Sequence, residues 1–220
     1  MRKKNNLDTR LLSCGGFLTL ADLDEKNMSL AAEVKDYIDF EKVFGNSNPV
    51  CLEIGCGKGK FVCEKAAQNP DINFIAIEKI SNVLIAAVER AKSENLKNVH
   101  FINCAAEVLP KYIPDGKIAK IYLNFSNPLP KEGYKKQRLT HPKFLALYAR
   151  LLSDGGEIEQ KTDDKPFFGF SLESYKLAGY KVLDVREDLA ANPVAGDVET
   201  EHEAKFKAEG KNIYYIKAQK

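Results

Sequence analysis

The sequence predicts an α/β fold in which a mostly parallel sheet carries helices on both faces. Three observations lead to this prediction. Short apolar runs alternate with segments of helical periodicity along the chain. The apolar run 49–54 breaks into glycines at alternating positions. The next apolar run ends in the carboxylate of Glu78. Alternation of this kind is typical of right-handed βαβ units.

The chain has 220 residues, which fits one large domain with a proper core. We expect a basic N-terminal segment over 1–28 that can be flexible, followed by a single domain over 29–220. The apolar content of 44% and charged content of 29% are ordinary for a globular protein. No apolar run approaches the ~18 residues of a membrane span, so we expect a cytoplasmic protein without membrane contact.

Seven strands are expected, and the last two can pair antiparallel at the edge of the sheet. The expected strands are 50–54, 73–78, 98–103, 118–125, 156–161, 180–187 and 212–218. The expected helices are 29–43, 59–68, 81–94, 104–111, 141–152 and 166–178. Asp154-Gly-Gly indicates a turn before the fifth strand, and Gly179 a helix C-cap. The polar stretch 188–211 is expected to form a long loop, either functional or mobile.

The glycines after the first strand indicate a nucleoside cofactor at the carboxyl end of the sheet. They fall at 55, 57 and 59, with Glu53 inside the strand end. A dinucleotide site prefers G-x-G-x-x-G. The E-x-G-x-G-x-G form resembles motif I of class I S-adenosylmethionine-dependent methyltransferases, in which Glu78 would accept hydrogen bonds from ribose hydroxyls. Two alternatives stay open here: NAD, and a plain turn with Glu78 in solvent.

Cysteine and charge patterns add two expectations. The five cysteines include no C-x-x-C pair and have no histidine at metal-ligand spacing, so we expect reduced, mostly buried thiols and no structural metal. The net charge is only +2, but cations cluster at two places, which would suit a polyanionic substrate or merely face solvent. These cations are Arg2, Lys3, Lys4 and Arg10, and then Lys131, Lys135, Lys136, Arg138 and Lys143.

Three later segments are expected at the same rim of the sheet. The fourth strand runs into a proline-stiffened turn at Asn127-Pro128, the fifth ends in Thr162-Asp163, and the long loop holds 199–206. In this order the chain resembles bacterial tRNA (guanine-N7)-methyltransferases. That family's motifs read roughly F-x-D-P-W-x-K, R-H-x-K-R-R, T-D and T-x-x-E-x-K-F. The resemblance runs from about residue 48 to the C-terminus. The matching residues are Phe125, Pro128, Lys131, Lys136, Arg138, Thr162, Asp163, Thr200, Glu203, Lys205 and Phe206.

The resemblance implies a Rossmann-like class I methyltransferase fold, S-adenosylmethionine as cofactor and tRNA as substrate, with methylation of a variable-loop guanine at N7. It places Asn127 at the catalytic position. Cofactor contacts are implied for Glu53, Gly55, Gly57, Glu78, Cys104, Ala105 and Asn127. Substrate contacts are implied for Lys131, Asp163, Thr200, Glu201, His202 and Glu203. Local alternatives remain: a solvated Lys131, a helix cap at Asp163 or Asp164, and a capping box at Thr200 and Glu203.

The chain departs from the family pattern at important positions. Asn127 replaces the central aspartate, Leu129 the tryptophan, and the basic run lacks two arginines and a histidine, with Tyr134 available to stack on a base. Position 104, commonly Asp or Asn in the family, is cysteine. Guanine N7 carries a free lone pair, so methyl transfer needs positioning and no general base. An asparagine facing guanine would leave one polar contact unmatched and weaken activity, or would turn its oxygen to guanine at little cost.

These departures leave two rivals to the methyltransferase interpretation. One is a tRNA-binding relative with weak or lost catalysis. The other is a small-molecule methyltransferase or a nicotinamide-dependent oxidoreductase on a similar sheet. The sequence leaves monomer and homodimer equally open, as well as the tRNA species preferred.

Overall fold

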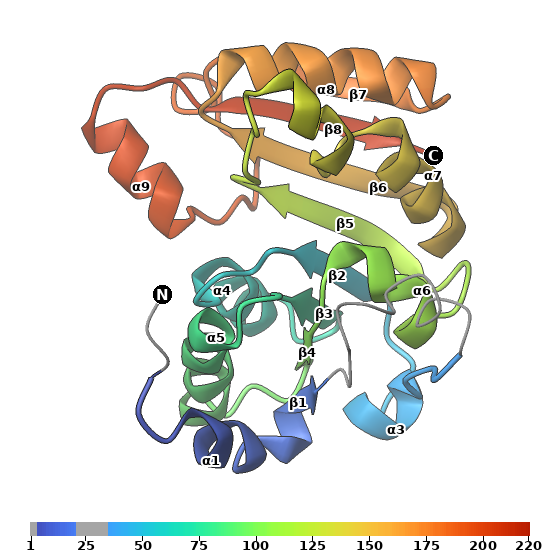
Figure 1. The fold of residues 1–220 in the computed structure, drawn as a ribbon, viewed down its shortest axis with the longest axis vertical. Helices are drawn as coiled ribbons and strands as arrows, with labels where there is room; N and C mark the ends of the chain where they lie inside the picture. Colours follow the sequence, from blue (N-terminus) through green and yellow to red (C-terminus); the bar gives the residue numbers. More distant parts are fainter. Residues whose placement is uncertain (1–3, 21–34) are drawn as a thin grey trace. The chain divides into compact units, whose positions relative to one another are not determined.

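The computed structural model describes residues 4–20 and 35–220 of the chain. By its internal contacts the chain divides into two compact units, 1–114 and 115–220, and each is described by itself. The elements of both units can be followed in Figure 1. The expectation of one domain over 29–220 stays a prediction. No helix in the described ranges is long and apolar enough to cross a membrane.

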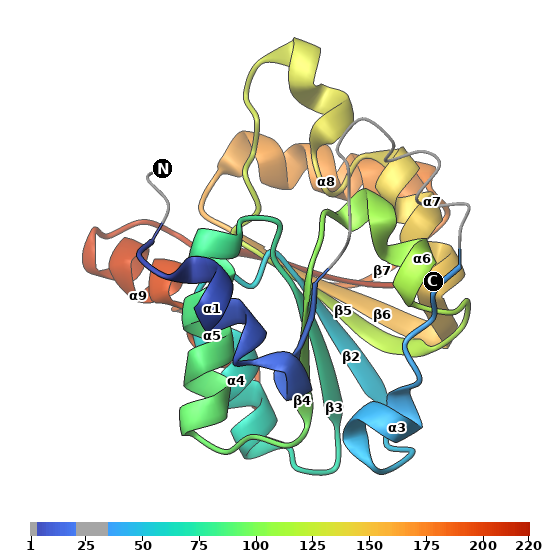
Figure 2. The same ribbon diagram turned by 60° about the horizontal axis from the view of Figure 1, so that its bottom comes forward.

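The first unit is a parallel four-stranded arrangement in the order β1-β4-β3-β2. Each of its longer strands is almost fully buried, as the continuous apolar runs predict. Helices α4 and α5 pack against each other beside the strands, with α1 alongside α5 (Figure 2). The elements are α1 (Leu7–Leu12), η1 (Gly15–Phe17), β1 (Leu18–Leu20), α3 (Phe40–Phe44), β2 (Val50–Ile54), α4 (Lys60–Gln68), β3 (Asn73–Ile77), α5 (Ser81–Ser93), β4 (Val99–Asn103), η3 (Ala106–Val108) and α6 (Leu109–Tyr112).

The second unit has the strand order β5-β6-β8-β7, with β5 and β6 parallel and β8 antiparallel to both of its neighbours. Helices α7 and α8 pack together, and α8 contacts β6, β7 and β8. The elements are β5 (Ile118–Asn124), η4 (Glu132–Gln137), α7 (Pro142–Leu151), β6 (Leu152–Thr162), α8 (Lys165–Leu177), β7 (Lys181–Arg186), α9 (Glu201–Ala208) and β8 (Tyr214–Gln219). The antiparallel pairing of the last two strands is confirmed.

Eight strands form within residues 4–20 and 35–220, where seven were expected for the chain. The additional strand, β1, pairs in parallel with β4, Leu18 opposite Phe101. The side chains of Thr19 and His100 bond across this pair, with 2.8 Å between Oγ1 and Nε2. A strand of three residues is too short to show a period, and this one lies in the segment interpreted as a basic tail. Part of that segment is therefore integrated into the sheet.

The helix expected over 29–43 is wrong at residues 35–39 and confirmed at residues 40–43. Residues 29–34 lie outside the described ranges, residues 35–39 are not helical, and α3 begins at Phe40. Asp39 caps this helix, since its carboxylate accepts from the backbone N–H of Lys42. The residues before it are bound elsewhere: the N–H groups of Asp36 and Ile38 donate to backbone carbonyls at the end of α6. Their hydrogen bonds therefore go to a neighbouring element instead of a helix.

Two further expectations need correction in the second unit. Asp154-Gly-Gly lies inside β6, which begins at Leu152, and it accompanies a register shift against β5, so it forms an irregularity within the strand and no turn before it. The segment 188–211 is no plain loop, since it contains α9. The remaining expected strands and helices are confirmed to within a few residues, except that 104–111 forms the short pieces η3 and α6. All five cysteines are buried and free, as expected.

Candidate functional site

The glycine turn after β2 has an unusual backbone. Gly55, Gly57 and Gly59 all have positive φ, at 82°, 59° and 80°. The N–H groups of Gly55 and Cys56 donate to the carbonyl of Ile77 at 2.8 and 3.0 Å, which ties the turn to the end of β3. Residues with a side chain rarely adopt these angles, so the repeated glycine reflects the backbone path.

The three glycines differ in what surrounds them. A Cβ at Gly59 would lie 2.6 Å from the Cβ of Ala87 in α5, so this glycine lets the turn pack against a helix. A Cβ at Gly55 or Gly57 would meet nothing within 4 Å. The backbone at these two positions can therefore be approached closely by a bound molecule.

Two acidic residues lie at the ends of the strands β2 and β3. Glu53 is only 2% exposed within β2. Glu78 directly follows β3 and is half-buried, and its Oε1 accepts from the backbone N–H of Ile80 at 2.9 Å. The side chain of Asn103 donates to the carbonyl of Glu78 at 2.8 Å. The carboxylate of Glu78 is therefore held at the carboxyl end of the strands.

The last residues of the predicted cofactor set follow β4. Cys104 is 3% exposed, and burial raises the pKa of its thiol to about 12, so this side chain is neutral. Ala105 is half-buried and precedes η3. The first unit thus brings together a glycine turn, a carboxylate and an apolar wall at the ends of β2, β3 and β4. Such a set can hold a nucleoside by its sugar and its base. Within the described ranges no group of three or more His, Cys, Asp or Glu could hold a metal ion.

The turn after β5 is conformationally strained. Phe125 and Leu129 have positive φ, at 50° and 45°, although both carry large side chains. Asn127 is exposed, and its Oδ1 accepts from the N–H of Leu129 at 3.1 Å. Non-glycine residues persist in this region only when their surroundings fix them, and they concentrate at functional sites. The amide oxygen of Asn127 is therefore occupied by its own turn.

Arg138 fixes this turn from outside. Its Nε and Nη2 donate to the carbonyl of Leu129 at 3.3 and 3.1 Å, and its guanidinium carbon lies 4.5 Å from the ring centre of Phe170 in α8. The sequence suggested that Arg138 belongs to a cluster of cations that meets a polyanion. The structure gives it a local role, since its donors point at the backbone and its face at an aromatic ring.

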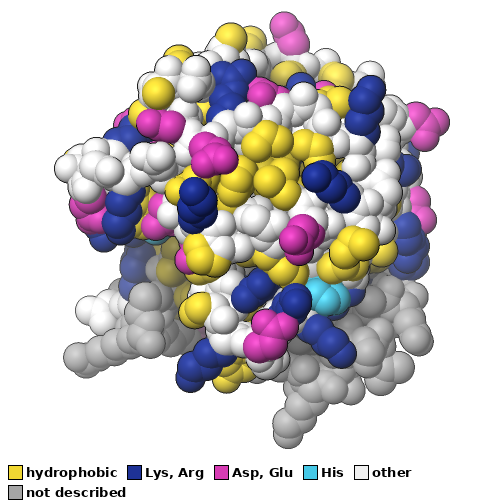
Figure 3. All heavy atoms as spheres, turned by 90° about the horizontal axis from the view of Figure 1, so that it is seen from above, with side chains coloured by type: hydrophobic (Ala, Val, Ile, Leu, Met, Phe, Trp, Pro, Cys, Tyr) yellow, Lys and Arg dark blue, Asp and Glu magenta, His cyan; other side chains and the backbone are white. Residues whose placement is uncertain are grey.

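The other cations of this cluster lie at the surface around η4. Lys131, Lys135, Lys136 and Lys143 are exposed. Burial and the nearby charges of Lys143, Lys136 and Lys135 lower the pKa of His141. Figure 3 shows Lys and Arg side chains gathered beside a histidine on one face. At the N-terminus, by contrast, Arg10 forms a bidentate ion pair with Glu89 at 2.6 Å, while Arg2 and Lys3 lie outside the described ranges.

Asp163 follows the end of β6 and is half-buried. Its neighbour Asp164 is the residue that caps α8, accepting from the N–H of Phe167 at 2.7 Å. The sequence left both aspartates open as caps. Because Asp164 fills that role, the capping alternative no longer explains Asp163.

The segment 200–203 divides into buried and exposed residues. Thr200 caps α9, its Oγ1 accepting from the N–H of Glu203 at 3.0 Å, and both side chains are buried. Glu201 and His202 are exposed. The ring of His202 stacks on that of Phe125, with 5.9 Å between centres and 20° between planes. Two elements of the second unit, the β5 turn and α9, are thus in direct contact.

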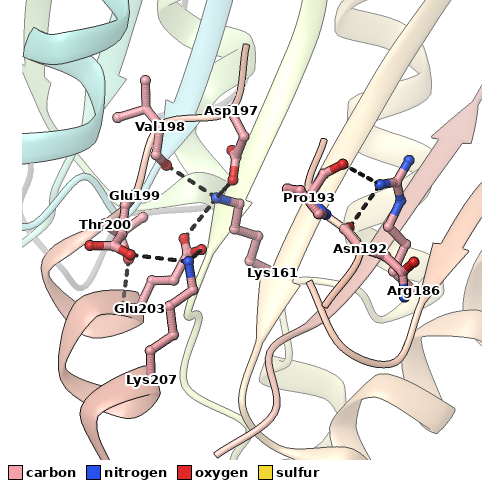
Figure 4. Close-up of polar contacts among 10 residues, drawn as sticks. All are labelled: Lys161, Arg186, Asn192, Pro193, Asp197, Val198, Glu199, Thr200, Glu203 and Lys207. Carbon is pink, nitrogen blue, oxygen red and sulfur yellow. Dashed lines mark hydrogen bonds and ion pairs between the residues drawn. The ribbon is translucent and has the colours of Figure 1, made fainter. Parts of the chain in front are cut away.

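Lys161 is the residue to which the sequence assigned no role. Its side chain is 4% exposed, and its Nζ contacts Asp197 at 2.6 Å, Glu203 at 2.8 Å and the carbonyl of Val198 at 3.1 Å (Figure 4). Lys207 contacts the same Glu203 at 2.8 Å. A lysine at the end of an expected strand was the available signal, because the last residues of β6 are buried and buried charges require partners.

Comparison with known proteins first defines the class. A family model described as "Putative methyltransferase" matches residues 47–216. Among solved structures, the 16S rRNA methyltransferase KamB superposes with a TM-score of 0.63 at 19% identity, covering 84% of this chain and 94% of that one. The chain therefore has the Rossmann-like α/β fold of class I methyltransferases, with eight strands among the described residues.

Relatives then define the family. The chain is 45% identical to a tRNA (guanine-N(7)-)-methyltransferase of Geobacillus thermodenitrificans, over 81% of this chain and 83% of that protein. It is 42% identical to the enzyme of the same name from Listeria monocytogenes, over 86% of this chain and 90% of that protein. The chain belongs to the tRNA (guanine-N7)-methyltransferase family.

Proposed function

We propose that this protein transfers the methyl group of S-adenosylmethionine to N7 of a guanine in the variable loop of tRNA, in the cytoplasm. The observation that carries this proposal is 45% identity to an enzyme of that activity, over a segment that includes both the open glycine turn and the β5 turn. The family supports the reaction. The position of the guanine in the tRNA rests on the resemblance alone.

The first unit supplies the cofactor contacts in this proposal. The unobstructed backbone at Gly55 and Gly57 suits close approach of the methionine part and the ribose. Glu78 would accept from the ribose hydroxyls, because a carboxylate is an acceptor only and a vicinal diol offers two donors. Glu53 would support the turn from β2. The neutral thiol of Cys104 and the methyl group of Ala105 would lie against the adenine, where an apolar surface suffices.

The second unit supplies the substrate contacts. Lys131 would meet a tRNA phosphate, and its exposure beside the other cations of η4 supports this role. Asp163, together with the segment Thr200 to Glu203, would contact the nucleoside. Within that segment the side chains of Glu201 and His202 are exposed, whereas those of Thr200 and Glu203 are buried and hold α9.

The chemistry requires orientation and little else. The N7 lone pair attacks the methyl carbon in line with the departing sulfur, so the new N–C bond forms as the S–C bond breaks. The cofactor leaves as neutral S-adenosylhomocysteine, and the positive charge passes to the guanine ring. Proximity and alignment then provide the rate enhancement. Asn127 is our candidate for holding the guanine. The turn that carries it is held by Arg138, and positive φ angles of non-glycine residues in this turn are typical of functional sites.

A methyl-transfer assay tests the proposal. Unmodified tRNA transcripts are incubated with enzyme and labelled S-adenosylmethionine, then cleaved at N7-methylguanine with borohydride and aniline. We expect one cleavage site, in the variable loop, and none in a transcript whose guanine there is replaced by adenine. Cleavage elsewhere would contradict the assigned position, and absence of transfer to any tRNA would contradict the activity.

One observation favours a second candidate, a tRNA-binding relative with weak catalysis. Because Oδ1 of Asn127 accepts from the N–H of Leu129, a guanine beside this amide would meet its NH₂ group. Guanine presents donors at N1 and N2, so two donors would face each other. The same assay decides: tRNA binding without transfer would favour this candidate.

A further inference from the structure

We infer that Lys161 is a positioning residue that fixes the RNA-facing segment of the second unit, and that Glu203 is its buried counter-ion. This inference rests on the proposed function for the identity of the substrate. Lys161 belongs to β6, and its ammonium group contacts the segment between β7 and β8 at Asp197, Val198 and Glu203 (Figure 4).

Charge balance explains why this contact is a strong anchor. Glu203 is 1% exposed and lies between Lys161 and Lys207. Burial alone would raise the pKa of Glu203, but these two cations outweigh burial and lower it, so the carboxylate stays charged. Removing one partner of a buried pair leaves the other charge without compensation, which is far less favourable than the intact pair. Movement of the segment away from β6 would therefore separate Asp197 and Glu203 from Lys161.

The same lysine also contacts the β5 turn through its backbone. The N–H of the strained residue Phe125 donates to the carbonyl of Lys161 at 2.9 Å. On the other side, the ring of Phe125 stacks on His202, which lies next to Glu203 in α9. One residue thus holds both segments for which substrate contacts are proposed: the turn of Asn127 by its carbonyl and the N-terminus of α9 by its ammonium group.

Two further contacts show that the segment is fixed at several points. Arg186 at the end of β7 donates to the carbonyls of Asn192 and Pro193 at 2.8 and 2.6 Å. Leu189 packs in a small cluster with Ile213 and Tyr215, which Phe125, Val194 and Phe206 cover. These contacts hold the first part of the segment, near residues 189–194, and the chain where it enters β8. Lys161 contacts residues on either side of Thr200 from β6, and Lys207 does so from within α9.

The test compares Lys161→Met with a matched control, Lys120→Met. Lys120 in β5 also contacts two carboxylates, Glu157 at 3.1 Å and Glu159 at 2.6 Å, but these belong to β6 and not to the segment. We expect Lys161→Met to lower kcat/KM for tRNA by about 100-fold, the cost of a misplacement of roughly 1 Å. The KM for S-adenosylmethionine should stay within about twofold, as should all constants of Lys120→Met.

Amide hydrogen exchange provides a readout that does not require activity. Exchange at residues 201–208 should become faster in Lys161→Met and stay unchanged in Lys120→Met. If the methionine variant fails to fold, Glu203→Gln replaces it, with the same direction in both readouts. Unchanged exchange in 201–208, or equal kinetic losses in the two lysine variants, would overturn the inference. Wild-type enzyme that methylates no tRNA would refute the proposed function, while the exchange result would still decide the role of Lys161.

Discussion

The two units hold their candidate site residues at the strand ends in different ways. In the first unit the candidate site is built from backbone: three glycines with positive φ, two N–H groups bound to Ile77 and a carboxylate at a strand end. In the second unit it is built from side chains: Arg138 on the β5 turn and Lys161 on the segment before α9. A rigid backbone can recognise a cofactor of constant shape, whereas in the second unit charged side chains hold in place the segments for which substrate contacts are proposed.

The largest expected effect is on stability, and it should differ between Gly59 and Gly57 in the glycine turn. Gly59→Ala should lower the free energy of unfolding by about 2–5 kcal/mol, combining the cost of a positive φ with overpacking against Ala87. Gly57→Ala carries only the backbone cost and should instead weaken cofactor binding. Denaturant unfolding and calorimetry measure the two quantities. Gly45→Ala, with a similar φ and open space, is the control for strain. Equal stability losses at 57 and 59 would contradict the distinct roles.

A pH effect of similar size concerns His100, which joins β4 to β1. Burial lowers its pKa from 6.5 to about 4, so the folded protein keeps this imidazole neutral. As the pH falls from 6.5 towards 4, the unfolded chain binds a proton that the folded chain does not, and stability is lost. The loss approaches about 3 kcal/mol.

Unfolding of wild type and His100→Leu at pH 7 and pH 4.5 measures this effect. The difference in stability between the two pH values should be smaller in the variant, although other groups titrate in both proteins. The loss of the bond to Thr19 affects both pH values alike. An identical pH dependence in the two proteins would show that His100 is not held neutral.

The next effect tests the second unit at Asn127. Asn127→Asp should raise kcat/KM for tRNA by about 10- to 100-fold, because one carboxylate oxygen can keep the bond to Leu129 while the other accepts from guanine. Single-turnover methylation measures the change. Asn124→Asp at the end of β5 is the control for added negative charge. A loss of activity in Asn127→Asp would mean that the amide NH₂ itself contacts the guanine or the cofactor.

The smallest effect concerns a single exposed charge. Lys131→Ala should weaken tRNA binding modestly and reduce the slope of log affinity against log salt by about 0.7–0.9, the value for one phosphate contact. Filter binding at several salt concentrations measures the slope. Arg10→Ala is the comparison, because Arg10 is already paired with Glu89. If both variants leave the same slope as wild type, Lys131 meets no phosphate.

The difference between the units also explains what the sequence could predict. The strands β2 to β4 could be predicted because each is a continuous apolar run. The turn after β2 could be predicted because closely spaced glycines indicate a backbone with positive φ. Helix α9 escaped prediction because the residue it buries is an acid, Glu203, and periodicity detects only apolar faces. Its cap, Thr200, was visible as one of two interpretations, and the structure supports the cap.

Long-range charge pairs mark the limit of sequence reasoning in the second unit. Lys161 could be recognised as a charge at the end of an expected strand, but its carboxylate partners lie 36 and 42 residues away along the chain. Spacing along the chain carries no information about such contacts. In the same way, the role of Arg138 depends on a carbonyl and a ring that only folding brings near it.

Titration calorimetry with S-adenosylhomocysteine tests the division between the units most directly. We expect the wild type to bind S-adenosylhomocysteine in one event. Glu78→Gln should bind it about 10- to 100-fold more weakly, and Lys131→Ala should bind it with unchanged affinity. Absence of binding to the wild type, or equal affinities in all three proteins, would contradict the assignment of the cofactor to the glycine turn of the first unit.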